Sequence, residues 1–148
     1  MFTILSISDS DKHWASAIAE FEKRLGKILT IENIKPAKNG SREQIISKDT
    51  ETLIQILEKK YSKYHKVLMT KDGKLVTTED FHALCTQNNH VVFIIGGPYG
   101  LDEPQLASLV QNKIAFGKIT LPHGLAKLTL AEQIYRSETM KTDKSYHY

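Results

Sequence analysis

The segment GGPYG (residues 96–100) directly follows an apolar stretch that ends at Ile95. Its glycine spacing differs from the G-x-G-x-x-G of dinucleotide-binding loops, and no Gly-Lys-Ser/Thr follows as in a P-loop, so a phosphate cradle is disfavoured. Two interpretations stay open. The segment could form a tight turn that needs a positive φ, or it could press its backbone against a flat ligand such as an adenosine.

Further candidates lie in the last thirty or so residues of the chain. The segment ITLPHG (residues 119–124) places His123 after a short apolar run. Imidazole suits proton exchange near neutral pH, although a lone histidine is more often structural. Glu132 and Arg136 have the spacing of an intrahelical ion pair. The terminal Tyr146 and His147 combine an aromatic and a basic group, which could hold an RNA base.

Other site classes are disfavoured. The sequence has no G-x-S-x-G elbow, H-E-x-x-H pair or Cys/His cluster, and Cys85 is its only cysteine, so we expect no disulfide and no metal site. Residues 1–74 carry 14 Lys/Arg and 10 Asp/Glu, against 6 and 7 in residues 75–148. This net charge of +3 permits an RNA partner without requiring one. Without a membrane-length apolar run or a basic signal-peptide n-region, we expect a cytoplasmic protein that does not enter a membrane.

Strand-like and helix-like periodicities alternate along the chain. We expect strands at residues 2–7, 29–34, 66–70, 91–95 and 119–121. We expect helices from a cap at Ser10 or Asp11 to residue 25, at 49–64, from Thr77 or Thr78 to 87, from Asp102 to 112, and at 125–140. Residues 35–43 are expected to form a polar loop, and residues 71–74 a turn that ends the third strand.

This alternation predicts an α/β fold whose mainly parallel sheet is covered by helices on both faces, within a single domain spanning residues 1–148. Ligands in such folds bind beyond the carboxyl ends of the strands. The loops MTKDGK (residues 69–74), GGPYG and PHG (residues 122–124) would meet there.

Three stretches resemble a known family. VVFIIGGPYGL (residues 91–101), ITLPHGLAKLTLAEQIYR (residues 119–136) and the terminal SYHY (residues 145–148) are similar to the ribosomal RNA large-subunit methyltransferase H family, which belongs to the SPOUT superfamily of knotted methyltransferases. The resemblance implies an S-adenosylmethionine-dependent enzyme that methylates N3 of a pseudouridine in large-subunit (23S) ribosomal RNA. It also implies a C-terminal trefoil knot, a homodimer, and ribosomal RNA or the ribosome as partner.

Site residues follow from the matching positions. The cofactor contacts implied are Met69, Gly97, Gly117, Lys118, Ile119, Thr120, Leu121 and Pro122. At Gly97 we expect a Cβ to occupy space that the cofactor needs. The substrate-side residues implied are His123, as a base or base-positioning group, and Lys127, Arg136, Tyr146 and His147.

Some positions depart from the family pattern. Lys127 stands where the family usually has arginine, which would turn a bidentate phosphate contact into a point-charge contact. Ser145 stands where proline is usual, and Ser8-Asp9-Ser10 where Val-Gly-Lys is commoner. Two other functions stay open: a non-catalytic RNA-binding or ribosome-assembly protein, and, less favoured by the glycine spacing, a dinucleotide-dependent oxidoreductase.

Overall fold

The computed structural model describes residues 1–9, 11–142 and 146. Its centre is a five-stranded sheet in the order β2-β1-β4-β3-β5, and every neighbouring pair is parallel. The strands are β1 (Phe2–Ile7), β2 (Leu29–Ile34), β3 (His65–Leu75), β4 (Val91–Ile95) and β5 (Asn112–Ala115). The helices are α1 (Ala15–Leu25), the 3-10 turn η1 (Gly26–Ile28), α2 (Arg42–Lys60), α3 (Thr78–Gln87), α4 (Glu103–Leu106) and α5 (His123–Lys141).

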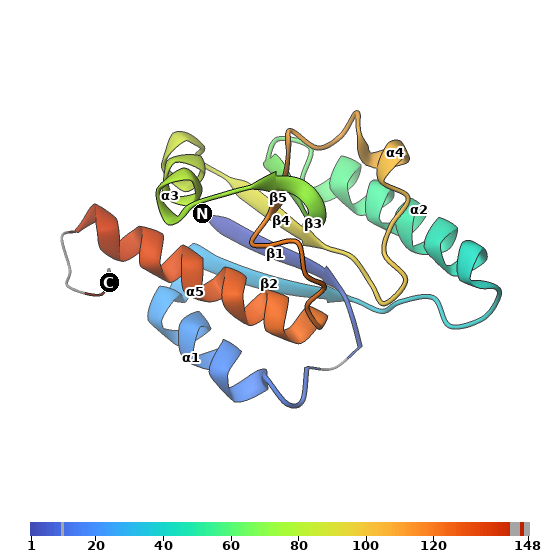
Figure 1. The fold of residues 1–148 in the computed structure, drawn as a ribbon, viewed down its shortest axis with the longest axis horizontal. Helices are drawn as coiled ribbons and strands as arrows, with labels where there is room; N and C mark the ends of the chain where they lie inside the picture. The colour runs from blue at the N-terminus through green and yellow to red at the C-terminus, as the bar shows by residue number, and fades with distance from the viewer. Residues whose placement is uncertain (10, 143–145, 147–148) are drawn as a thin grey trace.

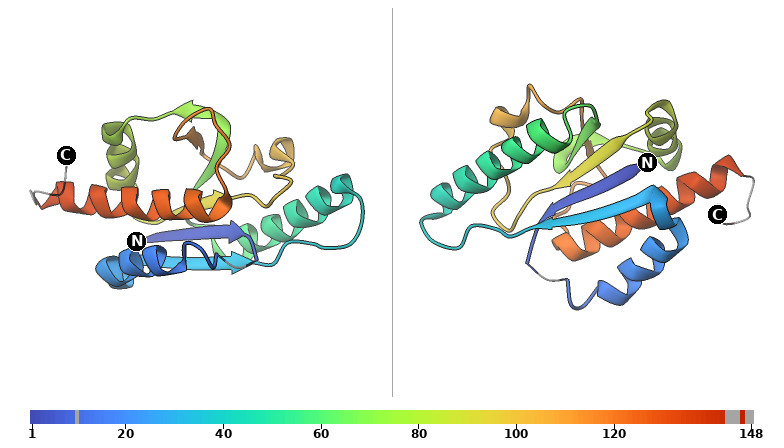
Figure 2. Two further views of the ribbon diagram at one scale, coloured as in Figure 1. Left: turned by 60° about the horizontal axis from the view of Figure 1, so that its bottom comes forward. Right: turned by 180° about the vertical axis from the view of Figure 1, so that it is seen from behind.

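Helices cover both faces of this sheet, as the sequence predicts. On one face α1, α3 and α5 bury a cluster around Phe93, which includes Leu25, Phe81 and Ile134. On the other face α2 and α4 bury Leu53, Leu57 and Leu106. Figure 1 shows α1 and α5 side by side, and the view from behind in Figure 2 shows the sheet between α2 and α5. Since β4 is the central strand, all of its residues are buried, which confirms the inference from its unbroken apolar run.

The predicted bounds are right where local signals are strong. β1, β2 and β4 have the predicted limits. The helix α3 begins after Thr77, whose side chain accepts a hydrogen bond from the backbone N–H of Asp80 in a capping box. The prediction that Asp11 caps α1 is wrong, because Trp14 is the residue that precedes this helix. Ser10 lies outside the described residues.

Two helix predictions near the loops are wrong. The helix α2 begins at Arg42, well before residue 49, because Ser41 and Gln44 form a capping box that the polar composition concealed. The helix after Asp102 has only four residues and ends at Leu106 instead of residue 112. The last helix, α5, begins at His123, so this histidine lies in a first helical turn and not on a loop tip.

The third and fifth strands also differ from the prediction. Asn112–Ala115 forms β5, whereas residues 119–121 belong to a loop. Short apolar runs look alike in the sequence, and only residues 112–115 find an open strand edge to pair with, that of β3. Residues 71–74 do not end β3. The strand bulges out between Met69 and Lys74 and then pairs again with β5.

Gly73 makes this second pairing possible. A Cβ at this position would lie 2.6 Å from the backbone nitrogen and 2.8 Å from the carbonyl carbon of Ile114. Two backbone segments therefore touch at a point where no side chain fits.

We predict that Gly73→Ala destabilises the fold, because backbone atoms of β5 cannot move aside as a flexible side chain could. Overpacking of this kind costs about 1–3 kcal/mol, and each kcal/mol lowers the Tm of a chain of this size by about 2–4 °C. Thermal unfolding measures the effect. Gly117→Ala is the matched control, since the nearest atom to its added Cβ is 4.0 Å away. Equal Tm values for the two variants would contradict the prediction.

Candidate functional site

The bulge of β3 and the carboxyl ends of β4 and β5 surround one pocket with a volume of about 800 Å³. Its wall is formed by residues 68–72, residues 95–101 and residues 114–123 without Lys118, together with Glu103 and Ala126. Because the three strands are parallel neighbours, the segments after β4 and β5 emerge at one edge of the sheet, beside the bulge of β3. The structure thus brings together residues from the three segments that the sequence singled out, although the first of them belongs to a strand and not to a loop.

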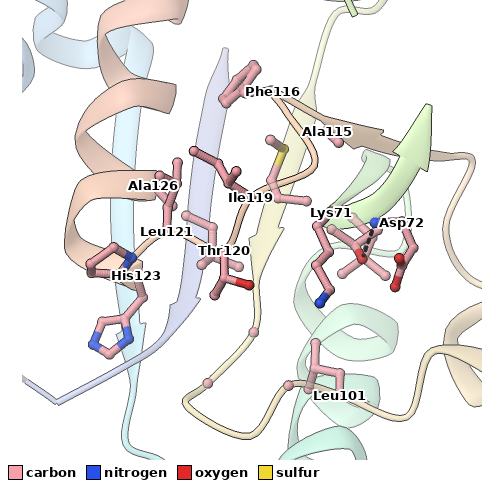
Figure 3. A pocket seen from close by; sticks show the side chains of 18 of the residues that line it. Lys71, Asp72, Leu101, Ala115, Phe116, Ile119, Thr120, Leu121, His123 and Ala126 are labelled. Atoms are coloured by element: carbon pink, nitrogen blue, oxygen red, sulfur yellow. Dashed lines mark hydrogen bonds between the residues drawn. The ribbon is translucent and has the colours of Figure 1, made fainter. Parts of the chain in front are cut away.

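Most of the predicted cofactor residues lie in this wall. Met69, Gly97, Gly117, Ile119, Thr120, Leu121 and Pro122 all line the pocket, and Lys118 does not. His123 lines it as well. In Figure 3 His123 lies at the rim beside the start of α5, and Lys71 and Asp72 lie on the opposite side. Within the described part of the chain the His123 imidazole makes no hydrogen bond, so its nitrogens are available to a bound molecule.

The glycine loop serves a different purpose at each glycine. Gly100 has φ +79° and its N–H donates to the carbonyl of Gly97 at 2.9 Å, which is the tight turn expected from the sequence. A Cβ at Gly97 would meet the Ile7 side chain at 3.1 Å and Asp49 Oδ2 at 3.4 Å. The expectation that this Cβ would occupy cofactor space is therefore wrong, because it points at β1 and α2. By contrast, a Cβ at Gly117 meets nothing closer than 4.0 Å.

Two side chains of α2 hold the loops that surround this edge. Thr50 is fully buried and accepts a hydrogen bond from the backbone N–H of Asp102 at 2.9 Å. The neighbouring Asp49 is 4% exposed and accepts from the N–H of Ala37 at 2.8 Å. One turn of α2 therefore fastens both the segment after β2 and the segment after β4.

No pattern in the sequence indicated a carboxylate at the pocket, yet Glu103 lies in its wall. Its side chain accepts a hydrogen bond from Thr70 Oγ1 at 3.0 Å and lies 3.5 Å from Lys113 Nζ. Asp72 lines the pocket too. Asp72 lies in β3 and Glu103 begins α4, so their common place in the pocket wall depends on the pairing of β3 with β4, and no spacing along the chain could have revealed it.

The predicted tail residues form a separate cluster. Arg136 pairs with Glu132 at 2.6 Å, as the spacing predicted, and its guanidinium carbon lies 5.0 Å from the centre of the Tyr146 ring. The Tyr146 hydroxyl donates to Glu132 at 3.2 Å, and burial and this carboxylate raise the pKa of Tyr146. Arg136 follows His123 by 13 residues of α5, which is about 20 Å along a helix. This cluster is therefore remote from the pocket of its own chain. His147 lies outside the described residues.

Lys127 is a structural residue, which contradicts the expected contact with an RNA phosphate. Its side chain is 1% exposed and forms an ion pair with Asp11. The ammonium group also donates to Asn33 Oδ1 at 2.6 Å and to Ser8 Oγ at 3.4 Å. Ser8 and Asp11 follow β1 and Asn33 lies in β2, so Lys127 joins α5 to that edge of the sheet and cannot reach a phosphate from this position.

We predict that Lys127→Met lowers the free energy of unfolding by about 3–5 kcal/mol, because it leaves the buried Asp11 carboxylate without its cation. The double variant Lys127→Met/Asp11→Ala should recover part of this loss. Urea unfolding measures both. The control Lys141→Met, near the exposed end of the same helix, should change stability by less than about 0.5 kcal/mol. If Lys127→Met unfolds like the wild type, the structural role of Lys127 is wrong.

Comparison with known proteins identifies the family. The model described as "Predicted SPOUT methyltransferase" matches residues 1–147. The chain is 32% identical to ribosomal RNA large subunit methyltransferase H of Mycoplasmopsis synoviae, over 97% of this chain and 96% of the relative. It is 34% identical to the Clostridium botulinum protein of the same name, over 98% of both chains. The protein of that name from Phocaeicola vulgatus is 31% identical over 99% of this chain and 98% of its own. The chain therefore belongs to the SPOUT methyltransferase family.

Proposed function

We propose that this protein uses S-adenosylmethionine to methylate N3 of a pseudouridine in large-subunit (23S) ribosomal RNA. The observation that carries the proposal is the convergence of three motif-bearing loops on one pocket at the carboxyl edge of the sheet. Family membership and the printed names of relatives support a ribosomal RNA substrate. The choice of N3 of pseudouridine rests on the resemblance of the sequence motifs alone.

The pocket residues fit the cofactor. A volume of about 800 Å³ lies within the usual range for small-molecule sites. Ile95, Leu101 and Ala126 offer apolar surface to a base, and the free space beside Gly117 lets a ligand approach the backbone. Glu103 adds a carboxylate that can accept hydrogen bonds from hydroxyl or amino groups. Met69, Gly97, Gly117 and residues 119–122 would hold the molecule. When bound, S-adenosylmethionine supplies an activated methyl group.

The contribution of the chain is to orient the reactants and to move a proton. Oriented binding of the two reactants can supply several kcal/mol of the barrier. The N3–H proton must leave as the nitrogen acquires the methyl group. The imidazole of His123, at the rim of the pocket and without a hydrogen-bond partner in the described chain, is placed to accept this proton or to position the base.

Two chains are needed to bring the tail to a pocket. Arg136 lies about 20 Å along α5 from His123, and Tyr146 packs against Arg136, so in a single protomer they cannot contact a nucleotide held beside that histidine. A homodimer can place the tail of one protomer near the pocket of its partner, and the predicted RNA contacts of Arg136, Tyr146 and His147 would then belong to the composite site. We propose this homodimer as the active form.

We further propose one domain over residues 1–148, a C-terminal trefoil knot and a cytoplasmic location. The knot rests on the resemblance of the sequence motifs alone. No helix among residues 1–9, 11–142 and 146 has the length and apolar character needed to span a membrane. Across that same part of the chain, no three His, Cys, Asp or Glu side chains gather as a metal-ligand set.

Ligand binding tests the function directly. We predict that the wild type binds S-adenosylhomocysteine but not NADH in calorimetry, and methylates ribosomes that lack this modification. Gly117→Val should remain folded, because its side chain points into free space, yet lose S-adenosylhomocysteine binding. Binding of NADH would favour an oxidoreductase. A wild type that binds RNA but neither cofactor would favour a non-catalytic assembly protein.

For the proton-transfer role, we predict that His123→Ala slows single-turnover methyl transfer by about 10²-fold or more, the range of general-base catalysis. Its affinity for S-adenosylhomocysteine should stay near the wild-type value. The matched control is His90→Ala, an exposed histidine at the amino end of β4 that stacks on Tyr64 outside the pocket. If His123→Ala loses cofactor affinity and methyl-transfer rate to the same extent, His123 has no role in the proton transfer.

A further inference from the structure

An exposed arginine–tyrosine pair lies at the mouth of the pocket. The guanidinium carbon of Arg42 is 5.5 Å from the centre of the Tyr99 ring. Tyr99 belongs to the glycine loop, lines the pocket and is 46% exposed. No other aromatic residue in the described chain is both this exposed and part of the pocket wall. An apolar ring left in water beside a ligand site has a surface that a partner could cover.

Arg42 differs from the other two arginines because they form ion pairs with carboxylates. Arg24 pairs with Glu20 at 2.9 Å, and Arg136 pairs with Glu132 at 2.6 Å. Among the described residues no carboxylate forms an ion pair with Arg42. Residues 35–42 also contain Lys35 and Lys38 and no acidic residue, and both lysines are exposed. These residues therefore form a cationic patch with no carboxylate of its own.

The fold holds this patch next to the glycine loop. Asp49 binds the N–H of Ala37 within the cationic segment, and Thr50 binds the N–H of Asp102 just after the glycine loop. Both acceptors are buried on the same turn of α2. The cationic segment and the glycine loop are consequently anchored to the same turn of α2, and Arg42 contacts Tyr99 although the two lie in different halves of the sequence.

The chemistry of the pair fits single-stranded RNA. Proteins recognise unpaired nucleotides by stacking bases on aromatic rings and guanidinium planes, and by binding phosphates with arginine and lysine. An exposed contact between a cation and a ring is weak, so a base can replace the guanidinium on Tyr99 at small cost. Arg42 is then released to bind a phosphate through its planar fork.

We propose that Tyr99, Arg42, Lys35 and Lys38 form an RNA-contact surface at the pocket mouth, which binds a nucleotide flanking the target base. Tyr99 stacks on the flanking base, and Arg42 and the lysines bind its backbone phosphates. This surface comes from the same chain as the cofactor pocket and is distinct from the cluster of Arg136 and Tyr146. This inference rests on the proposed function, because that function supplies the ribosomal RNA that the surface would bind.

The test compares paired variants at each position. Tyr99→Leu removes the aromatic face, and Tyr99→Phe keeps it. Arg42→Gln removes a charge at the first residue of α2, and Lys60→Gln removes one at the last residue, where Lys60 lies 5.5 Å from the Tyr61 ring. The two cations are 18 residues apart on one helix, which is about 27 Å. Each variant is assayed for binding to large ribosomal subunits, for S-adenosylhomocysteine affinity, and for methyl transfer.

We predict that Tyr99→Leu raises the KM and Kd for the ribosomal substrate roughly tenfold or more, as expected for loss of one stacked base. Tyr99→Phe should stay within about twofold of the wild type, because it keeps the stacking face. Arg42→Gln should weaken subunit binding and lower the slope of log Kd against log salt by about one, whereas Lys60→Gln should not. All four variants should bind S-adenosylhomocysteine like the wild type.

Three outcomes would overturn the proposal. Wild-type RNA affinity in Tyr99→Leu would show that the ring is not a stacking surface. Loss of S-adenosylhomocysteine affinity in Tyr99→Leu would assign the ring to the cofactor. Equal effects of Arg42→Gln and Lys60→Gln would show only a general charge effect. If the wild type binds subunits through Tyr99 but never methylates them, the proposed function fails while this surface stands, because subunit binding is measured without catalysis.

Discussion

The parallel pairing of β3 with β4 and β5 is the constraint on which the pocket depends. Parallel neighbours end at the same edge of a sheet, so the segments that follow them must share the space beyond it. The bulge of β3 then allows the strand to pair again with β5, and Gly73 lets the two backbones touch. If this contact were absent, residues 114–123 would have no fixed path past β3, and one wall of the pocket would be lost.

Buried polar groups give this edge its shape. Hydrophobic packing places α2 and α5 on opposite faces of the sheet, but it does not orient the loops. The loops are oriented by hydrogen bonds from Asp49 and Thr50 on α2 and by the ion pair of Lys127 with Asp11. Since an unpaired buried polar group is costly, each of these contacts restricts its segment to few conformations. The conformation of the site therefore depends on residues that need not touch a ligand.

Two groups of predicted site residues lie apart in the molecule. His123 lies at the beginning of α5 beside the pocket, and Arg136 lies farther along the same helix, in contact with the ring of Tyr146. The helix keeps His123 and Arg136 about 20 Å apart within one protomer. The cationic segment near Arg42 has the opposite arrangement, because α2 holds it beside the pocket of its own chain.

Local patterns in the sequence predict much of the sheet, and the motifs predict many of the residues that line the pocket. The runs of β1 and β4 predict strands because all of their residues are buried in the middle of the sheet. The capping box at Thr77 predicts the start of α3 because its contacts lie within four residues. Motif positions such as Met69 and Gly117 could be assigned to the site because they match positions of a known family, and both line the pocket.

The remaining features depend on contacts between distant parts of the chain. In the folded chain β3 extends past Thr70, β5 precedes the predicted strand, and the Gly97 Cβ position points toward Ile7. Lys127, which the sequence had suggested as an RNA contact, is also buried. The physical reason is the same in each case. The partner that fixes the residue, whether a strand edge, a side chain or a carboxylate, lies far away in the sequence, and its distance and direction exist only in the folded chain.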